Sequence, residues 1–90
     1  MSISESFKAL AVPMRRDILD LLKEGKMSAG DIASHFNVTQ PAISYHLNIL
    51  KKANLIYESK YKNFIYYELN TTVFDHLILW LKTIKGADEE

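Results

Sequence analysis

Apolar side chains recur every three or four residues through the first part of the chain, which is the spacing of a helix with one buried face. The residues between these repeats mark helix ends: Pro13 suits a first turn, and Ser28 and Thr39 are suitable N-caps. Gly25 and Asn37 tolerate the left-handed backbone that follows a helix. The pattern predicts four helices: Glu5–Ala11, a segment from Pro13 to a stop at Gly25, Ala29–Phe36 and Thr39–Ala53.

The second part of the chain changes to an alternating pattern. Leu55–Lys60 and Phe64–Leu69 are rich in Tyr, Ile and Phe, and the polar loop Tyr61–Asn63 between them predicts a hairpin. A last helix is predicted over Val73–Lys85, with Thr71 or Thr72 as its N-cap and Gly86 after its end. The order α-α-α-α-β-β-α describes a mainly α fold with a minor β part, in a single domain over residues 1–90.

The fourth predicted helix has two unlike faces. On a helical wheel Ile43, Leu47 and Leu50 share one side, which we expect to be buried. The opposite side carries Pro41, Ser44, Tyr45, Asn48 and Lys52, with Gln40 at its leading end. A solvated helix face usually favours Glu, Lys and Arg, whereas these short polar side chains offer directional donors and acceptors for base edges and phosphates. A polar face that only meets water is the alternative.

The third and fourth predicted helices, joined by the tight turn Asn37–Val38, have helix-turn-helix spacing over about residues 28–53. In a major groove the N-terminal half of the second helix would reach the bases first, where a glutamine can pair with adenine. The hairpin over about residues 55–69 then has the place of a wing against the DNA backbone. The predicted DNA contacts are Thr39, Gln40, Ser44, Tyr45, Asn48, Lys60 and Lys62.

Charge adds to this prediction only locally. The chain has eleven basic and eleven acidic residues, so its net charge is zero. Between Thr39 and Phe64, however, four lysines (51, 52, 60 and 62) stand against the single acid Glu58. This local basic excess beside a polar helix face is the electrostatic footprint of a DNA-binding surface. Arg15 and Arg16 are further candidates for phosphate contact, or for salt bridges to Asp17, Asp20 or Glu5.

The last predicted helix is apolar over an arc wider than the ~100° that one small core requires. We expect one part of this arc to pack on the subunit and the rest to pair with a second copy, which makes the protein a homodimer. A helix sunk entirely in its own core is the alternative. The dimerisation segments are predicted at about residues 5–11 and 72–85, with Phe7, Leu10, Val73, Leu77, Trp80, Leu81 and Ile84 as the contact residues.

The sequence favours neither a metal site nor catalysis. Cysteine is absent, and the three histidines are His35, His46 and His76. Asp75 and His76 are adjacent on a helix and point about 100° apart, and Lys82 and Lys85 near its end repel a cation. We expect His35 and His46 to be hydrogen-bonded residues behind the surface, with phosphate contact as the alternative for His46. Asp31 and Ser34 lie near His35 in the sequence, but no second carboxylate, oxyanion nest or phosphate-binding glycine loop accompanies them, so an enzyme, a metal and a cofactor are all unexpected.

Three segments carry a family resemblance: Gly30–Ile56, the FIYYELN sequence of Phe64–Asn70, and Pro13–Leu22. Together they resemble the winged helix-turn-helix repressors of the ArsR type, and within that family the SdpR-type autorepressors. The resemblance implies a homodimeric repressor of an inverted-repeat operator, often that of its own operon. Carried over by position, the base-contacting residues are Gln40, Ser44 and Tyr45, and many relatives have His where Tyr45 stands.

The expected partners are double-stranded DNA and a second copy of the chain. A protein-interaction module of the same fold is one rival, and a ligand- or metal-responsive repressor is another, which would need a cavity near the dimer seam. Without a ligand, release from DNA must have another cause, and a regulatory protein that competes for the recognition face is one candidate. The longest apolar run, Leu77–Leu81, is far shorter than the ~20 residues of a membrane span. With no signal-peptide pattern at the start, these features predict a cytoplasmic protein without membrane insertion.

Overall fold

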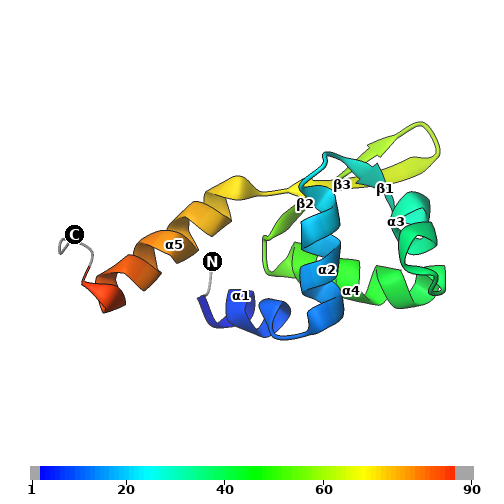
Figure 1. Ribbon diagram of the computed structural model, residues 1–90. Coiled ribbons are helices and arrows are strands. Elements are labelled where there is room, and N and C mark those ends of the chain that lie inside the picture. Colours follow the sequence, from blue (N-terminus) through cyan, green and yellow to red (C-terminus); the bar gives the residue numbers. More distant parts are fainter. Residues whose placement is uncertain (1–2, 87–90) are drawn as a thin grey trace.

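A computed structural model describes residues 3–86. Figure 1 shows α2, α3 and α4 gathered beside a small sheet, while α5 runs outward from the end of β3 with α1 below it. The elements in chain order are α1 (Ile3–Leu10), α2 (Pro13–Leu22), β1 (Met27–Ser28), α3 (Ala29–Phe36), α4 (Gln40–Lys52), β2 (Ile56–Tyr61), β3 (Phe64–Leu69) and α5 (Thr71–Lys85). This is a winged helix-turn-helix, mostly helical, and the predicted fold class is confirmed.

The sheet has three antiparallel strands in the order β1-β3-β2. Strands β2 and β3 pair from Ile56↔Leu69 to Tyr61↔Phe64, so the hairpin loop is shorter than predicted. Lys62 stands at this turn with a φ of 58°. Strand β1, which pairs Met27 with Tyr67, was missed because two residues are too few to show an alternating pattern.

Two predicted helix N-caps are confirmed. The Ser28 Oγ accepts a hydrogen bond from the Asp31 amide at 3.1 Å, and the Thr39 Oγ1 accepts one from the Ala42 amide at 3.3 Å. The turn between these two helices also has the predicted form, because Asn37 adopts the left-handed conformation with a φ of 55°. These caps define where α3 and α4 begin, and so which α4 residues face outward.

Other helix boundaries differ from the prediction. Helix α1 spans Ile3–Leu10 and not Glu5–Ala11. Helix α2 ends at Leu22, and Gly25 lies beyond it with a φ of 128°. Helix α5 begins at Thr71, so its N-cap is Asn70 and neither predicted threonine. Asn70 is buried, and its Nδ2 donates to the Asn54 carbonyl at 2.8 Å, which ties the start of α5 to the end of α4. A tertiary hydrogen bond therefore replaces the side-chain cap expected from local sequence.

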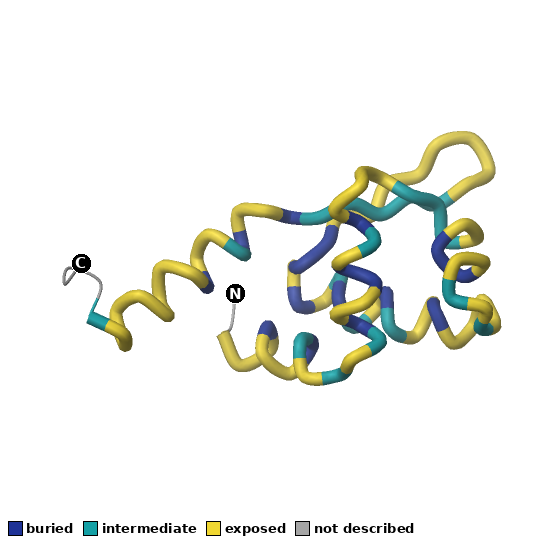
Figure 2. The backbone as a smooth tube through the Cα atoms, viewed as in Figure 1, coloured by how far each residue is buried: buried dark blue, intermediate teal, exposed yellow. Residues whose placement is uncertain are grey.

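The core lies between α2, α3, α4 and the sheet. Ile18, Ile32, Ile43, Leu47 and Leu50 are fully buried, so the predicted apolar side of the recognition helix is confirmed. Figure 2 shows that burial is concentrated in these elements, whereas α5 is exposed over most of its length. None of the helices within residues 3–86 has the length and apolar character needed to cross a lipid bilayer.

Candidate nucleic-acid interface

Helix α4 presents its polar side to solvent. Gln40, Ser44 and Asn48 are exposed, and the Tyr45 side chain is 62 % exposed. Thr39 is also exposed, and because its Oγ1 accepts the cap hydrogen bond, its hydroxyl hydrogen remains available to donate. The four predicted contact residues of α4 and its N-cap Thr39 are therefore all accessible, whereas the isoleucine and leucines of the same helix are buried.

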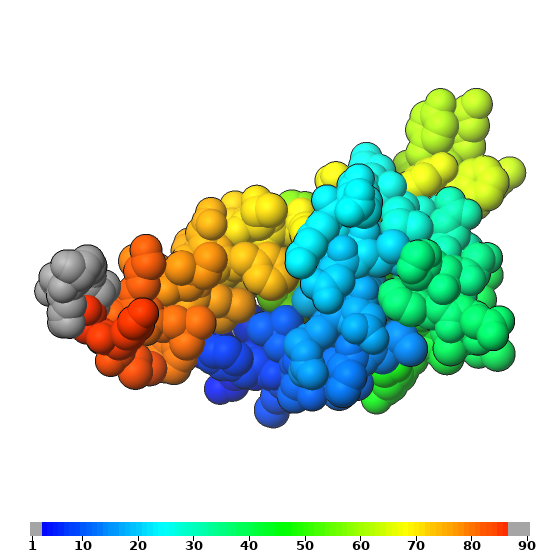
Figure 3. Space-filling model, in the orientation of Figure 1, coloured from blue at the N-terminus to red at the C-terminus, as the bar shows by residue number. Residues whose placement is uncertain are grey.

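The wing tip lies next to the start of the recognition helix. A hollow of about 320 Å³ is lined by Gln40 from α4 and by Asn63 and Phe64 from the hairpin, with the first turn of α3 as its remaining wall. Figure 3 shows the hairpin standing clear of the body, so its tip is open to a partner. Gln40 and the wing tip thus border one recess, as a surface that follows a duplex requires.

The basic side chains of this surface divide into two groups. Lys52, Lys60 and Lys62 are exposed, and the Lys62 Nζ lies 5.4 Å from the centre of the Tyr61 ring. Lys51 instead forms an ion pair with Glu58, its Nζ 2.8 Å from the Glu58 Oε1. The three exposed lysines are consequently the cations available to phosphate.

Glu58 on β2 links the wing to α4 through its ion pair with Lys51. The hydrogen bond from Lys51 holds the pKa of Glu58 below its ordinary value, and the Tyr67 hydroxyl donates to the other carboxylate oxygen at 3.3 Å. Burial, followed by the neighbouring Glu58 charge, raises the pKa of Tyr67. The contact orients the hairpin relative to the recognition helix, although a half-exposed ion pair contributes only about 0–1 kcal/mol to stability.

Behind the recognition face lies a buried arginine. Arg15 is 7 % exposed; its Nε donates to the Ala9 carbonyl at 2.8 Å, and its Nη2 donates to the Lys8 carbonyl at 3.2 Å. Its Nη1 lies 3.4 Å from the Nδ1 of His46 on α4. Burial, followed by the Arg15 charge, lowers the pKa of His46. Phosphate contact by Arg15 is therefore a wrong prediction, whereas a hydrogen-bonded His46 is confirmed.

One related prediction also needs correction. His35 is exposed, with its ring centre 5.2 Å from that of Phe36, and does not lie behind the surface. Arg16 donates to the Leu10 carbonyl at 2.7 Å. The acids Asp17, Asp20 and Glu24 border a separate hollow with His35, away from the wing. These three acids lie outside the recess beside Gln40 and the wing tip, whereas the exposed Asp31 is one of the residues that line that recess.

Comparison with known proteins decides the family. The family model "Bacterial regulatory protein, arsR family" matches residues 13–58. The chain is 59 % identical over 75 residues to the transcriptional repressor SdpR of Bacillus subtilis (strain 168), covering 83 % of each. The chain belongs to the ArsR family. It is a DNA-binding transcriptional repressor of that family and not an enzyme.

Solved structures of ArsR-family regulators support the fold. One crystal structure matches with a TM-score of 0.88 at 24 % identity, covering 98 % of this chain and 97 % of the other. A homodimeric winged helix-turn-helix DNA-binding domain from Mycobacterium bovis, residues 1–100, matches with a TM-score of 0.77 at 25 % identity, covering 98 % and 82 %. The first shows the fold alone, and the second is itself a dimer.

In this ArsR-family chain, the predicted dimer residues divide into two sets. Val73 is 1 % exposed and Leu77 is 6 % exposed, so both belong to the subunit's own core and were wrongly assigned to a partner contact. Leu10 is half-buried. Phe7, Trp80, Leu81 and Ile84 are exposed, and the Phe7 and Trp80 ring centres lie 5.7 Å apart, which joins α1 to α5. Ile3, Ile78 and Leu79 are also exposed, although they were not among the predicted contact residues.

Among residues 3–86 no three His, Asp or Glu side chains come close enough together to bind a metal ion.

The burial of Arg15 was not predicted from the sequence. Its signal was available, because Arg15 is spaced three and four residues before Ile18 and Leu19 and therefore shares their buried face.

Proposed function

We propose that this repressor binds an inverted-repeat operator as a homodimer, and that the operator includes DNA upstream of its own gene. The observation that carries the proposal is the juxtaposition of the exposed polar side of α4 with the wing tip around one recess. A recognition helix fits the major groove, and the adjoining hairpin then follows the sugar–phosphate backbone. Autoregulation is supported by the likeness to SdpR-type autorepressors.

Each side chain has a role suited to its chemistry. Gln40, at the start of α4, pairs with adenine N6 and N7, while Ser44 and Tyr45 contact neighbouring base edges one turn further along. Asn48 adds an amide to the same face. Thr39 contacts a phosphate near the helix N-terminus, where amide groups favour an anion. Lys60 and Lys62 neutralise phosphates beside the wing.

The dimer part of the proposal rests on the exposed apolar surface of α1 and α5. An isolated subunit would leave Trp80, Leu81 and Ile84 in contact with water, which stable monomers avoid on this scale. The homodimeric Mycobacterium bovis domain of the same fold supports a two-fold arrangement. Two recognition helices would then stand about 34 Å apart, one helical turn of DNA.

We further propose that repression needs no metal and takes place in the cytoplasm with the chromosomal DNA. The described residues offer no cluster of metal ligands, and the distal end of α5 carries the exposed cations Lys82 and Lys85. Addition of a chelator is therefore expected to leave DNA binding unchanged. The signal that releases the repressor then has to be another small molecule or a regulatory protein.

Binding to the DNA upstream of the protein's own gene tests the proposal. We expect fluorescence anisotropy to give an affinity that falls steeply between about 50 mM and 200 mM salt, with random DNA of equal length bound more weakly. The same titration with a chelator is expected to superimpose. Equal, salt-independent binding to both DNAs would favour the protein-interaction module instead.

A further inference from the structure

Two aromatic side chains stand exposed at the tip of the wing. Tyr61, the last residue of β2, pairs directly with Phe64, the first residue of β3, so both side chains project from the same face of the hairpin. Each of them is more than half exposed. The loop Lys62–Asn63 joins the two residues at the end of the hairpin. The wing therefore ends in an apolar pair as well as in its lysines.

Phe64 also borders the recognition helix. It lines the recess of about 320 Å³ together with Gln40, the first residue of α4. A duplex whose major groove receives α4 passes close to this ring where its backbone crosses toward the wing. The aromatic pair is thus continuous with the candidate DNA surface.

The charge around the pair is positive. Lys60 and Lys62 flank Tyr61, both are exposed, and no acid occurs from residue 59 to residue 67. The Lys62 Nζ lies 5.4 Å from the centre of the Tyr61 ring, so the cation and the ring are presented together. The acid that lines the recess, Asp31, belongs to the first turn of α3 and not to the wing. Lysines beside exposed rings suit a polyanion that also offers apolar surface, which describes nucleic acid.

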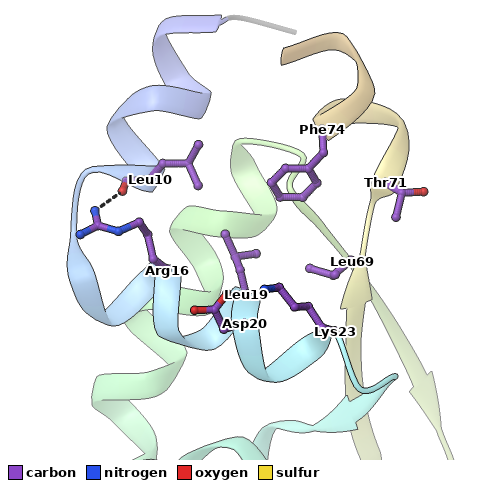
Figure 4. A pocket seen from close by; sticks show the side chains of 8 residues that line it. All are labelled: Leu10, Arg16, Leu19, Asp20, Lys23, Leu69, Thr71 and Phe74. Carbon is purple, nitrogen blue, oxygen red and sulfur yellow. Dashed lines mark hydrogen bonds and ion pairs between the residues drawn. The ribbon is translucent and has the colours of Figure 1, made fainter. Parts of the chain in front are cut away.

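A second copy of the chain is accommodated elsewhere. Helix α5 runs away from the hairpin with α1 below it, and these two helices carry the proposed dimer surface (Figure 1). The apolar hollow that Leu10, Leu19 and Phe74 border is on that side of the subunit as well (Figure 4). Two wing tips would moreover meet with like charge. Dimer formation therefore leaves the wing tip accessible.

We propose that Tyr61 and Phe64 enter the minor groove beside each half-site and make its flanking base pairs part of the recognised sequence. In this groove a G·C pair presents the guanine N2 amine, whereas an A·T pair presents only acceptors. The protruding amine obstructs close contact by an aromatic ring, so the pair favours A·T flanks. Apolar wedges of this kind occur in several classes of minor-groove protein. The inference deepens the proposed function and rests on its assignment of the wing to DNA.

Stabilisation of the hairpin is the alternative role of the pair. Cross-strand aromatic pairs stabilise antiparallel strands, and the Phe64 ring centre also lies 6.3 Å from that of Tyr66. Such a role affects the unfolding of the free protein and not its choice between DNA sequences. Sequence choice is therefore the readout that separates the two roles.

The test uses the full chain and three duplexes from upstream of its own gene, which share the footprinted half-sites and differ only in the flanking base pairs. The flanks are A·T, G·C or inosine·C; inosine lacks the N2 amine but keeps the major-groove groups of guanine. We expect the A·T and inosine duplexes to bind about tenfold more tightly than the G·C duplex. Equal affinities for all three duplexes would overturn the proposal.

Variants assign this preference to the aromatic pair. The double substitution Tyr61→Thr and Phe64→Thr removes both rings and keeps residues that favour strands. It is expected to bind the A·T and inosine duplexes about tenfold more weakly and all three duplexes nearly alike. The salt slope is expected to stay unchanged, because both lysines remain. A double variant that keeps the preference would overturn the proposal.

Tyr57→Thr is the matched control. Tyr57 is also exposed and lies on the same face of β2, about 13 Å along the strand from Tyr61. This variant is expected to keep the affinity and the flank preference of the parent protein. Thermal unfolding of each variant checks that it folds. Unchanged DNA binding by the double variant together with a lower unfolding temperature would assign the rings to hairpin stability and overturn the proposal.

The outcomes separate this inference from the proposed function. A chain that prefers its upstream DNA to random DNA but ignores the flanks supports the operator and overturns the minor-groove contact. A chain that binds upstream and random DNA alike contradicts the proposed operator. In that case about tenfold weaker binding of an A·T-rich random duplex by the double variant would support the minor-groove contact, and equal binding would overturn it.

Discussion

Arg15 and His46 meet behind the recognition face, with the Arg15 Nη1 3.4 Å from the His46 Nδ1. An arginine can only donate, so His46 accepts through Nδ1 and is neutral with its proton on Nε2. The same guanidinium also binds carbonyls at the end of α1. The His46 ring lies 5.2 Å from the ring of the exposed Tyr45, so this contact connects α1 with the polar side of α4.

This contact predicts a pH dependence of stability. Burial and Arg15 hold the pKa of folded His46 below 6.5, so the unfolded chain binds more protons in the range between the two pKa values. Stability present above about pH 6.5 is therefore lost as the pH falls through the folded-state pKa. Urea unfolding at about pH 7.5 and 5.5 measures the loss. His46→Gln keeps an acceptor for Arg15 and is expected to reduce the dependence; an unchanged dependence in this variant would assign it to other groups.

Substitutions in the recognition helix and in the wing are expected to weaken DNA binding in different ways. Gln40→Ala is expected to weaken binding to the operator by about 1–3 kcal/mol and to change binding to random DNA far less, because it removes a base contact. Anisotropy titrations with both DNAs measure this difference. Equal losses on the two DNAs would remove Gln40 from the base-contacting set.

Lys62→Ala is expected to weaken binding to the operator and to random DNA alike, because phosphates are common to both. The slope of log affinity against log salt is expected to fall by about one. Lys26→Ala, which removes an exposed lysine outside the proposed interface, serves as the control. A slope equal to that of the parent protein would place Lys62 away from the DNA.

The apolar α5 surface predicts the oligomeric state. Leu81→Glu with Ile84→Glu places two carboxylates on a surface that is exposed in the subunit, so the variant is expected to fold but to remain monomeric. Sedimentation at micromolar concentration measures the change, and Thr72→Glu at the exposed start of α5 is the control. A dimer that persists in the double variant would place the interface on another surface.

Substitution of Asn70 is expected to lower the stability of the fold and not to remove a DNA contact. Asn70→Ala removes the hydrogen bond to the Asn54 carbonyl at the junction of α4, β3 and α5, and is expected to cost about 1–3 kcal/mol. Denaturant unfolding measures it, with Asn48→Ala at an exposed site as the control. A loss no greater than that of the control would mean that water replaces this hydrogen bond.

The recognition face could be predicted because it depends on local pattern alone. Helical spacing separates Ile43 and Leu47 from Ser44 and Tyr45, and the N-caps that set the helix starts lie within three residues of their partners. The Arg15–His46 contact joins residues 31 positions apart. Such a pairing depends on how α2 packs against α4, and periodicity carries no information about it.

The same reasoning explains the errors on α5. The apolar arc of this helix is wider than the core of one subunit requires, but the pattern alone could not say which of its residues pack within the subunit. That division depends on where the helix leaves the sheet, which Asn70 sets through its contact with Asn54. Val73 and Leu77 consequently turn toward the core, while Leu81 and Ile84 lie beyond it.

The most direct test of the central claim is a map of amide resonance changes when DNA from upstream of the gene is added to the full chain. We predict the largest changes at Gln40, Ser44 and Tyr45 and around Lys62, with small changes at the acidic side chains of α2. Large changes along α2 with an unperturbed α4 would contradict the assignment of the recognition face.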